Sequence, residues 1–181
     1  MTHAAGYARA VAARRAFRLP DYPTLAEEGF DGEYVSPIQM TSGSLTGPML
    51  VSKDWLDAPS VRRHRAELTR QGYLSTNPFN RVIDKVLALL DLTRADIYIT
   101  PVFHLLTPQR SSTIPPAHAR ASWEAIGQFE RLGRRPIALG HDAARVLNHF
   151  NVPHIRAPHP SARTGTFDAK AEAIAEAIQT A

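Results

Sequence analysis

Cysteine is absent from this chain of 181 residues, so disulfide bonds, thiolate metal sites and iron–sulfur clusters are excluded. Long apolar runs are lacking as well, because no stretch approaches the roughly 20 apolar residues that a membrane-spanning helix requires. The first residues also lack the apolar core of a secretory signal. We therefore expect a cytoplasmic protein, associated with the nucleoid if its source is bacterial.

Lysine is scarce too, occurring only at Lys53, Lys85 and Lys170, and arginine supplies the rest of the 21 basic residues. The formal net charge of +4 permits a polyanionic partner without demanding one. The distribution of charge is more informative, since residues 143–167 contain arginines and histidines but no acid. This basic stretch includes the loop 157–166.

Short apolar runs alternate with helical patterns after residue 47, which predicts an α/β fold. We expect a three-layer α/β/α sandwich with a central four-stranded parallel sheet, forming one domain over residues 1–181. Within it, residues 1–47 should comprise a helix over 3–17 and an irregular region. The strands are expected at 48–52, 96–100, 136–140 and 153–157, and the helices at 60–70, 77–90, 117–132, 142–150 and 166–179.

The carboxyl ends of the four expected strands define the candidate site, because open parallel sheets bind ligands beyond that edge. The first strand leads into Lys53, Asp54 and Trp55. An aspartate just past a buried strand can be held partly desolvated and so act as a base or an anionic stabiliser. The alternative is that Asp54 caps the next turn and Trp55 belongs to the core.

The second strand leads into His104 and a proline-stiffened loop that carries Ser111 and Ser112. His104 is a candidate substrate contact, although a structural role is equally compatible with its position. The two serine hydroxyls and neighbouring backbone amides are suited to gripping a phosphate backbone. The alternative is that this segment is a structured surface loop that binds no ligand.

The fourth strand leads into His159, which Pro158 and Pro160 flank on both sides. Ser161 can orient the imidazole or donate to a phosphate, and Arg163 and Thr164 stand on the following short loop. The helix that begins near residue 166 directs its free amide groups toward this loop, which favours an anion there. The third strand, by contrast, ends in Gly140, for which a packing role is the expectation.

The order of these segments resembles the uracil-DNA glycosylase superfamily from about residue 47 to 178. The segments 48–55, 96–100 and 135–144 are similar to its first motif, second strand and third strand with the following helix, and His159-Pro160-Ser161 matches its second catalytic motif. The resemblance implies a monomeric enzyme without cofactor or metal, of a branch lacking an iron–sulfur cluster, that acts on uracil in single- or double-stranded DNA.

The resemblance also implies roles for individual residues. Asp54 would position water and offset the cationic sugar, and His159 would stabilise charge on the leaving base. Phe79 would stack on the flipped base, unless its ring belongs to the core of the helix 77–90, and Arg163 would enter the duplex as a wedge. Base extrusion of this kind costs only a few kcal/mol.

The first motif departs from the family's glycine-led pattern, since it reads Ser-Lys-Asp-Trp. The most serious departure is Pro101, which stands where the second strand usually supplies an asparagine that reads uracil. Proline offers neither a side-chain polar group nor an amide proton. Recognition would then depend on main-chain groups near Lys53 and Trp55, or on His104 or Asn77. The alternatives are a different deaminated base, such as hypoxanthine, and a silent module that binds damaged or abasic DNA.

Overall fold

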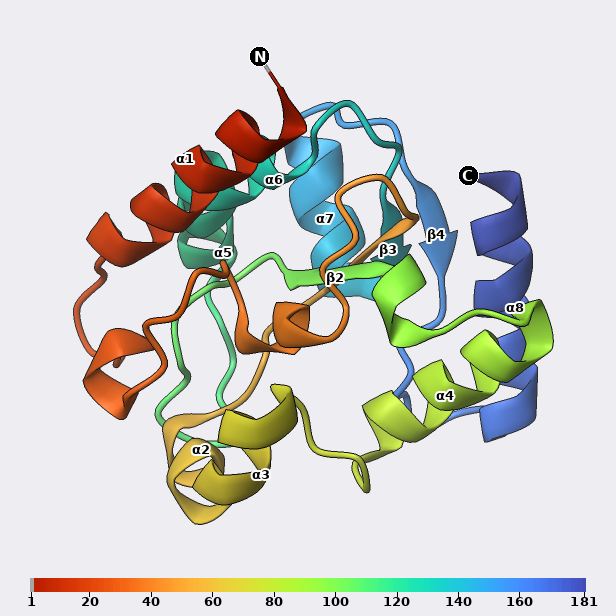
Figure 1. Cartoon of the computed structure of the whole chain (residues 1–181), viewed down its shortest axis with the longest axis horizontal. Helices are drawn as coiled ribbons and strands as arrows, with labels where there is room; N and C mark the ends of the chain where they lie inside the picture. Colours follow the sequence, from red (N-terminus) through yellow and green to blue (C-terminus); the bar gives the residue numbers. More distant parts are fainter. Residues whose placement is uncertain (1) are drawn as a thin grey trace.

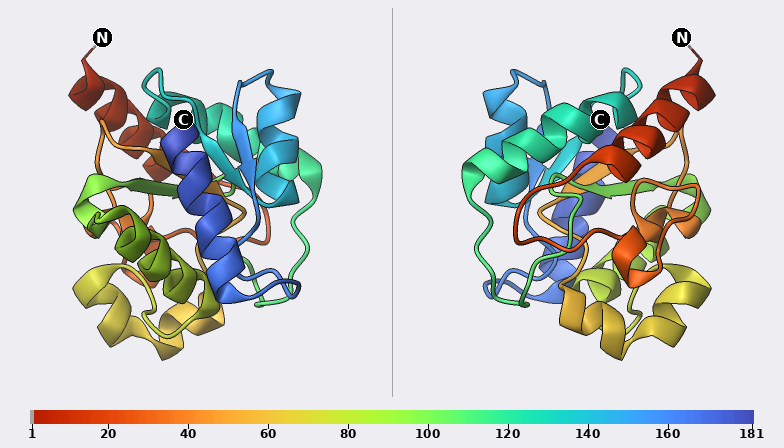
Figure 2. Two further views of the ribbon diagram at one scale, coloured as in Figure 1. Left: turned by 90° about the vertical axis from the view of Figure 1, so that its right-hand side faces the viewer. Right: turned by 90° about the vertical axis from the view of Figure 1, so that its left-hand side faces the viewer.

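The computed structural model describes residues 2–181, and Met1 lies outside the described residues (Figure 1). Four parallel strands form one sheet in the order β2-β1-β3-β4. Helices cover both of its faces, so the three-layer α/β/α sandwich is confirmed (Figure 2). The strands are β1 (Met49–Ser52), β2 (Tyr98–Pro101), β3 (Ile137–Leu139) and β4 (Ile155–Ala157).

Helices α4 (Pro78–Leu90) and α8 (Phe167–Thr180) pack together on one face of the sheet. Each begins with a side-chain cap: Asn77 Oδ1 accepts from the amide of Asn80, and Thr166 Oγ1 accepts from the amide of Ala169. Such caps satisfy backbone donors that have no partner within the helix. The core on this face contains Leu50, Val82, Ile83, Val86, Ile99, Ile137 and Ile174.

The other face carries α5 (Pro116–Ser122), a π-helical turn (Trp123–Gly127), α6 (Gln128–Glu130) and α7 (His141–His149). The sequence predicts one helix over 117–132, and the structure instead interrupts it with this turn. Helix α1 (His3–Ala16) packs across the turn and α6 as an outer layer. The core on this face contains Met49, Val51, Tyr98, Phe103, Trp123, Ala138, Val146 and Leu147.

The segment between α1 and β1 closes the free edge of β2 as well as connecting the two elements. It contains two 3₁₀ turns (Ala26–Glu28 and Pro37–Met40). Ile99 N donates to Ser42 O at 3.0 Å, and Ser44 N donates to Ile97 O at 3.1 Å. Because an unpaired sheet edge exposes backbone groups that invite association, this pairing protects the domain.

The segment 60–70 forms two short helices where the sequence predicts one. Helix α2 (Ala58–Arg63) ends at His64, and α3 (Arg65–Gln71) ends at Gly72. Arg62 and Arg65 both bind the carboxylate of Glu28, which ties the pair of helices to the amino-terminal region. Their apolar sides pack in a separate cluster with Leu25, Phe30, Leu74 and Leu106.

Two further details differ from expectation. Residues Arg94–Asp96 form a 3₁₀ turn, in which the Asp96 carboxylate accepts from Thr93, so the second strand begins only at Tyr98. Leu89, an apolar residue within the predicted helix 77–90, is 56% exposed and so lies outside the buried face of α4. Within residues 2–181, no helix combines the length and apolar character that crossing a bilayer demands.

Candidate functional site

A cavity of about 930 Å³ opens at the carboxyl ends of β1, β2 and β4. Its volume is at the upper end of the range typical for small-ligand sites. Asp54 and His159, the two expected catalytic residues, both line it although they are 105 positions apart in the chain. The other expected residues on its wall are Lys53, Trp55, Asn77, Phe79 and Ser161.

The imidazole of His159 is held by the backbone of its own loop. The amide of Ser161 donates to Nδ1 of His159 at 3.1 Å. Because Nδ1 acts as an acceptor, the neutral ring carries its proton on Nε2. The loop therefore presents His159 as an Nε2–H donor.

Burial lowers the pKa of His159 below the ordinary histidine value. The positive charges of Lys53 and Lys170 lower it further, while the carboxylate of Asp142 raises it. The net direction favours the neutral ring at physiological pH. The neutral ring with its proton on Nε2 is consequently the favoured form of His159 under these conditions.

Gly140 permits the close approach of the His159 loop to the end of β3. A Cβ atom at this position would lie 2.9 Å from Cβ of His159, and Gly140 has a φ of +89°. Its amide also donates to Ala157 O at 2.9 Å. The sequence predicts a packing role for this glycine, and the structure shows that the packing partner is the candidate catalytic histidine.

Lys170 is a component of the site that sequence reasoning missed. Its side chain is buried, and Nζ donates to Ala162 O at 2.7 Å, which fastens the loop 158–165 to α8. A buried lysine requires such a partner because an unpaired buried charge is costly. The signal in the sequence was weak: a lone lysine in an Ala-rich helical pattern.

Burial raises the pKa of the Asp54 carboxyl above the ordinary aspartate value. Lys53 opposes this effect, and the carboxylates of Asp142 and Asp57 reinforce it. A raised pKa is suited to a group that must accept a proton during turnover. Asp142, in the first turn of α7, therefore influences both Asp54 and His159.

The capping role considered for Asp54 belongs instead to Asp57. The carboxylate of Asp57 accepts from Ser60 N at 2.9 Å and from Ser60 Oγ at 2.6 Å. Trp55 is largely structural, since its Nε1 donates to Gly72 O at 3.0 Å and its ring packs edge-on against Phe30. Only part of the indole is left to form the cavity wall.

Phe79 is half-buried and lies beside the histidine, with the centroids of the Phe79 and His159 rings 5.7 Å apart. It thus reaches the cavity although it also contacts the core beneath α4. Asn77 uses Oδ1 to cap α4, while its Nδ2 makes no hydrogen bond to any of residues 2–181. That amide nitrogen is left as a donor for a ligand carbonyl.

Pro101 also lines the cavity, at the end of β2. It is buried and its register partner is Ser52 on β1. This part of the wall consequently offers no side-chain hydrogen bond to a base.

The structure does not bring His104 to the cavity. Its ring is fully buried between two core residues, with Nδ1 2.8 Å from Ser122 Oγ and Nε2 3.1 Å from Glu130 Oε2. Glu130 also accepts from Tyr98, Thr100 and Gln39. His104 is therefore part of a buried polar network between the sheet and the helices α5 and α6.

The residues expected to contact DNA lie at different places around the site. Arg163 and Thr164 are exposed on the loop before α8, and Ser111 is exposed on the loop after β2. The hydroxyl of Ser112 accepts from Gln109 N, so it stabilises its own loop. Ser112 O accepts from Lys53 Nζ at 3.3 Å, which connects this loop to the end of β1.

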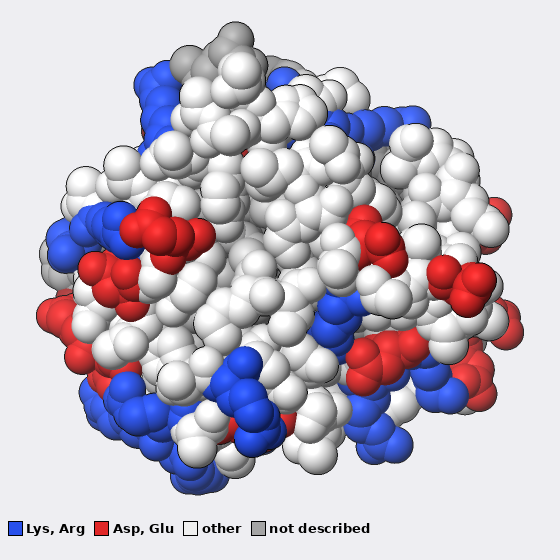
Figure 3. Space-filling model, viewed as in Figure 1, with Lys and Arg blue, Asp and Glu red and all other residues white. Residues whose placement is uncertain are grey.

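Basic side chains surround part of the cavity mouth. Lys53, Arg63, His64 and Arg110 all line it. On the face seen in Figure 3, lysine and arginine gather at the lower left over α2 and α3, with acidic residues beside them. A cationic rim around an otherwise mixed cavity is suited to a phosphate-bearing ligand.

Comparison with models of protein families and with curated proteins finds no match to this chain. Among residues 2–181, no group of three or more histidine, aspartate and glutamate side chains is placed to hold a metal ion.

Proposed function

We propose that this protein is a DNA glycosylase that hydrolyses the N-glycosidic bond of uracil in DNA. The observation that carries the proposal is the convergence of Asp54, His159 and Phe79 on one cavity at the carboxyl edge of the sheet. These residues supply a carboxylate, a hydrogen-bond donor and an aromatic platform. The motif order along the chain, similar to that of the uracil-DNA glycosylase superfamily, supports the same assignment.

His159 would act on the departing base. Cleavage of the bond between C1′ and N1 leaves the electron pair on the base, and negative charge accumulates on its O2 oxygen. The Nε2–H of a neutral imidazole, aligned by Ser161 N, donates to that oxygen as the charge develops. Because burial disfavours protonation of the ring, the donor is maintained without an added positive charge.

Asp54 would act on the sugar. As a carboxylate it stabilises the cationic character at C1′ and orients the attacking water, whose proton it can accept. The water oxygen bonds to C1′, and the products are the free base and an abasic site. The raised pKa of Asp54 makes this proton transfer easier than for an ordinary aspartate.

The base reaches such a cavity only after extrusion from its stack. Phe79 would then stack on the flipped base, a contact typically worth about 1–3 kcal/mol per base. Arg163, exposed on the loop that follows His159, would occupy the space the base leaves in a duplex. The cationic rim would hold the flanking phosphates.

A deaminated purine such as hypoxanthine is a second candidate substrate, and two observations favour it. Pro101 leaves the expected uracil-reading position without a polar group, and the cavity is large for a pyrimidine alone. The Asn77 amide nitrogen can donate to a carbonyl of either base, so it does not distinguish them.

The test is a base-release assay on single- and double-stranded oligonucleotides that contain uracil, hypoxanthine or xanthine, run in chelator. Strand breakage at the uracil after alkali is the expected result, with the strongly impaired Asp54→Asn variant as the control. Cleavage restricted to hypoxanthine or xanthine would contradict the uracil assignment and identify a deaminated purine as the substrate. Tight binding to abasic DNA without release of any base would refute glycosylase activity.

A further inference from the structure

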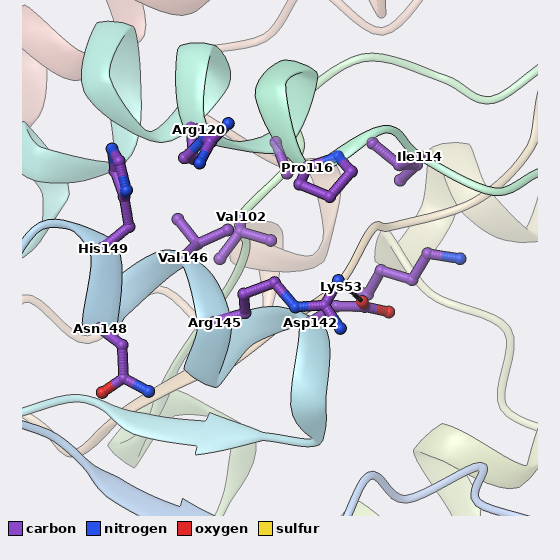
Figure 4. Close-up of a pocket in the computed structure, with 11 residues that line it drawn as sticks. Lys53, Val102, Ile114, Pro116, Arg120, Asp142, Arg145, Val146, Asn148 and His149 are labelled. Carbon is purple, nitrogen blue, oxygen red and sulfur yellow. Dashed lines mark ion pairs between the residues drawn. The ribbon is translucent and has the colours of Figure 1, made fainter.

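A second cavity of about 360 Å³ lies between α5 and α7, on the face of the sheet opposite α4 and α8. Figure 4 shows Pro116 and Arg120 on α5 facing Val146 and His149 on α7, with Val102 between them. Of the residues considered above for chemistry, this cavity contains only Lys53 and Asp142. We refer to it as the α5–α7 cleft.

The α5–α7 cleft combines an apolar floor with a basic rim. Val102, Ile114, Ala119 and Val146 are buried apolar residues that form the floor. The rim carries Arg120, Arg145, His149 and Lys53, and Asp142 is its one acid. Arg145 lies 4.0 Å from Asp142 with both side chains more than half exposed, so this pair leaves the arginine available to a stronger anion.

The cleft adjoins the reaction cavity, because Lys53 lines both. Lys53 also fastens the loop 107–115 through Ser112 O. Asp142, on the wall of the cleft, acts electrostatically on both Asp54 and His159. A ligand in the cleft would therefore lie next to the reacting nucleotide and would affect the charges around it.

We propose that the α5–α7 cleft holds the nucleotide adjacent to the extruded one on the same DNA strand. Its base would lie against Val102, Ile114 and Val146, and its phosphate would bind Arg120 and Arg145. The two cavities share the wall residue Lys53 and so adjoin, as sites for two consecutive nucleotides joined by one sugar-phosphate unit must. This inference rests on the proposed action on DNA. It specifies where the enzyme holds the neighbouring nucleotide of the strand that contains the extruded base.

The first experiment uses single-stranded oligonucleotides with one uracil and a tetrahydrofuran abasic analogue immediately 5′ or 3′ of it. Loss of the neighbouring base on one side should weaken binding about tenfold, because stacking and apolar contact to that base are lost. Loss on the other side should have little effect. Ala119→Phe, which fills the floor of the cleft, should remove the difference between the two sides.

The second experiment tests the rim without disturbing the core. Arg145→Ala and Arg120→Ala should each weaken binding about fivefold and reduce the slope of log affinity against log salt by about one. Arg135→Ala is the matched control, because this exposed arginine precedes β3 at the opposite end of the strand. It should leave both quantities at their wild-type values.

The outcomes separate this inference from the proposed function. Uracil release that is insensitive to both neighbouring bases, with equal salt slopes for Arg145→Ala and Arg135→Ala, would overturn the cleft assignment and leave the glycosylase intact. Binding that depends on one neighbouring base, without release of any base, would support the cleft and refute the glycosylase. A protein that neither binds nor cleaves these oligonucleotides would overturn both.

Discussion

The backbone amide of Ser161 donates to Nδ1 of His159 at 3.1 Å, and this one hydrogen bond determines which ring nitrogen carries the proton. Together with burial, which lowers the pKa of the ring, it produces a neutral Nε2–H donor directed by a short, proline-flanked loop. Because the donor is a backbone amide, a side-chain substitution at Ser161 should leave this hydrogen bond in place. The serine hydroxyl is therefore not required to fix the tautomer of His159.

Replacing His159 with alanine should reduce kcat for uracil release by about 10²–10³-fold with little change in KM, because the donor acts mainly on charge that develops in the transition state. Single-turnover base release with saturating enzyme measures this step. His141→Ala is the control, since this nearby histidine is exposed and does not line either cavity. A His159→Ala enzyme with near-normal turnover would contradict the assignment.

The rate should fall at acidic pH as Asp54 becomes protonated. Since burial raises the pKa of this carboxyl, the fall begins at a higher pH than for an ordinary aspartate. Asp54→Asn should lower kcat about 10²-fold and eliminate this limb from the residual activity. A profile of kcat/KM against pH for both proteins makes the comparison, and an unchanged acid limb in the variant would exclude Asp54 as its source.

The same carboxyl has a predictable effect on stability. A raised pKa in the folded state means that folding becomes less favourable as pH rises from the ordinary aspartate value through the raised one. Asp54→Asn should therefore raise Tm at pH 7 by a few degrees and leave it unchanged at strongly acidic pH. Asp57→Ala is a control with the opposite expected effect, because loss of this helix cap should lower the free energy of unfolding by about 1 kcal/mol.

Gly140→Ala tests the contact between the end of β3 and the loop that carries His159. The added Cβ would meet His159 Cβ at 2.9 Å, and the φ of +89° is strained for alanine, so both kcat and stability should fall. Gly133→Ala provides the matched control, because Gly133 has a φ of +82° and nothing within 4 Å of the new Cβ. It should lose only the stability that the backbone strain costs, as measured by urea unfolding, and keep its turnover.

Phe79→Ala should weaken binding of uracil-containing DNA about tenfold or more by loss of stacking, with the larger effect on KM. Fluorescence anisotropy with single-stranded oligonucleotides is a suitable measurement. Leu89→Ala lies on the same helix and removes an exposed side chain, so its affinity should equal that of the wild type. If the two variants bind the oligonucleotide with equal affinity, Phe79 has only a structural role.

Several features of the fold could be read from local sequence. Apolar runs of strand length alternate with helical periodicity after residue 47, and Asn77 and Thr166 occupy the cap positions that their side chains suggest. The rule for ligands in open parallel sheets then placed the candidate site at the strands' carboxyl ends. Boundaries were less predictable, as the break at His64 and the π-helical turn at Trp123–Gly127 show.

The roles of individual polar residues were decided by contacts between distant parts of the chain. His104 and His159 both follow strands, yet packing against Ser122 and Glu130 buries the first and leaves the second in the cavity. Asp54 and Asp57 are three residues apart, and only the geometry of α2 shows which of them is the cap.

The sequence by itself determined the layered α/β architecture and the loop 157–166, because periodicity, prolines and cap residues act over a few neighbouring positions. Only the tertiary structure decided which side chains share a cavity, how Gly140 and Lys170 hold the His159 loop, and where the α5–α7 cleft lies. These features depend on contacts between side chains that are distant in the sequence. The spacing of residues along the chain does not reveal such contacts.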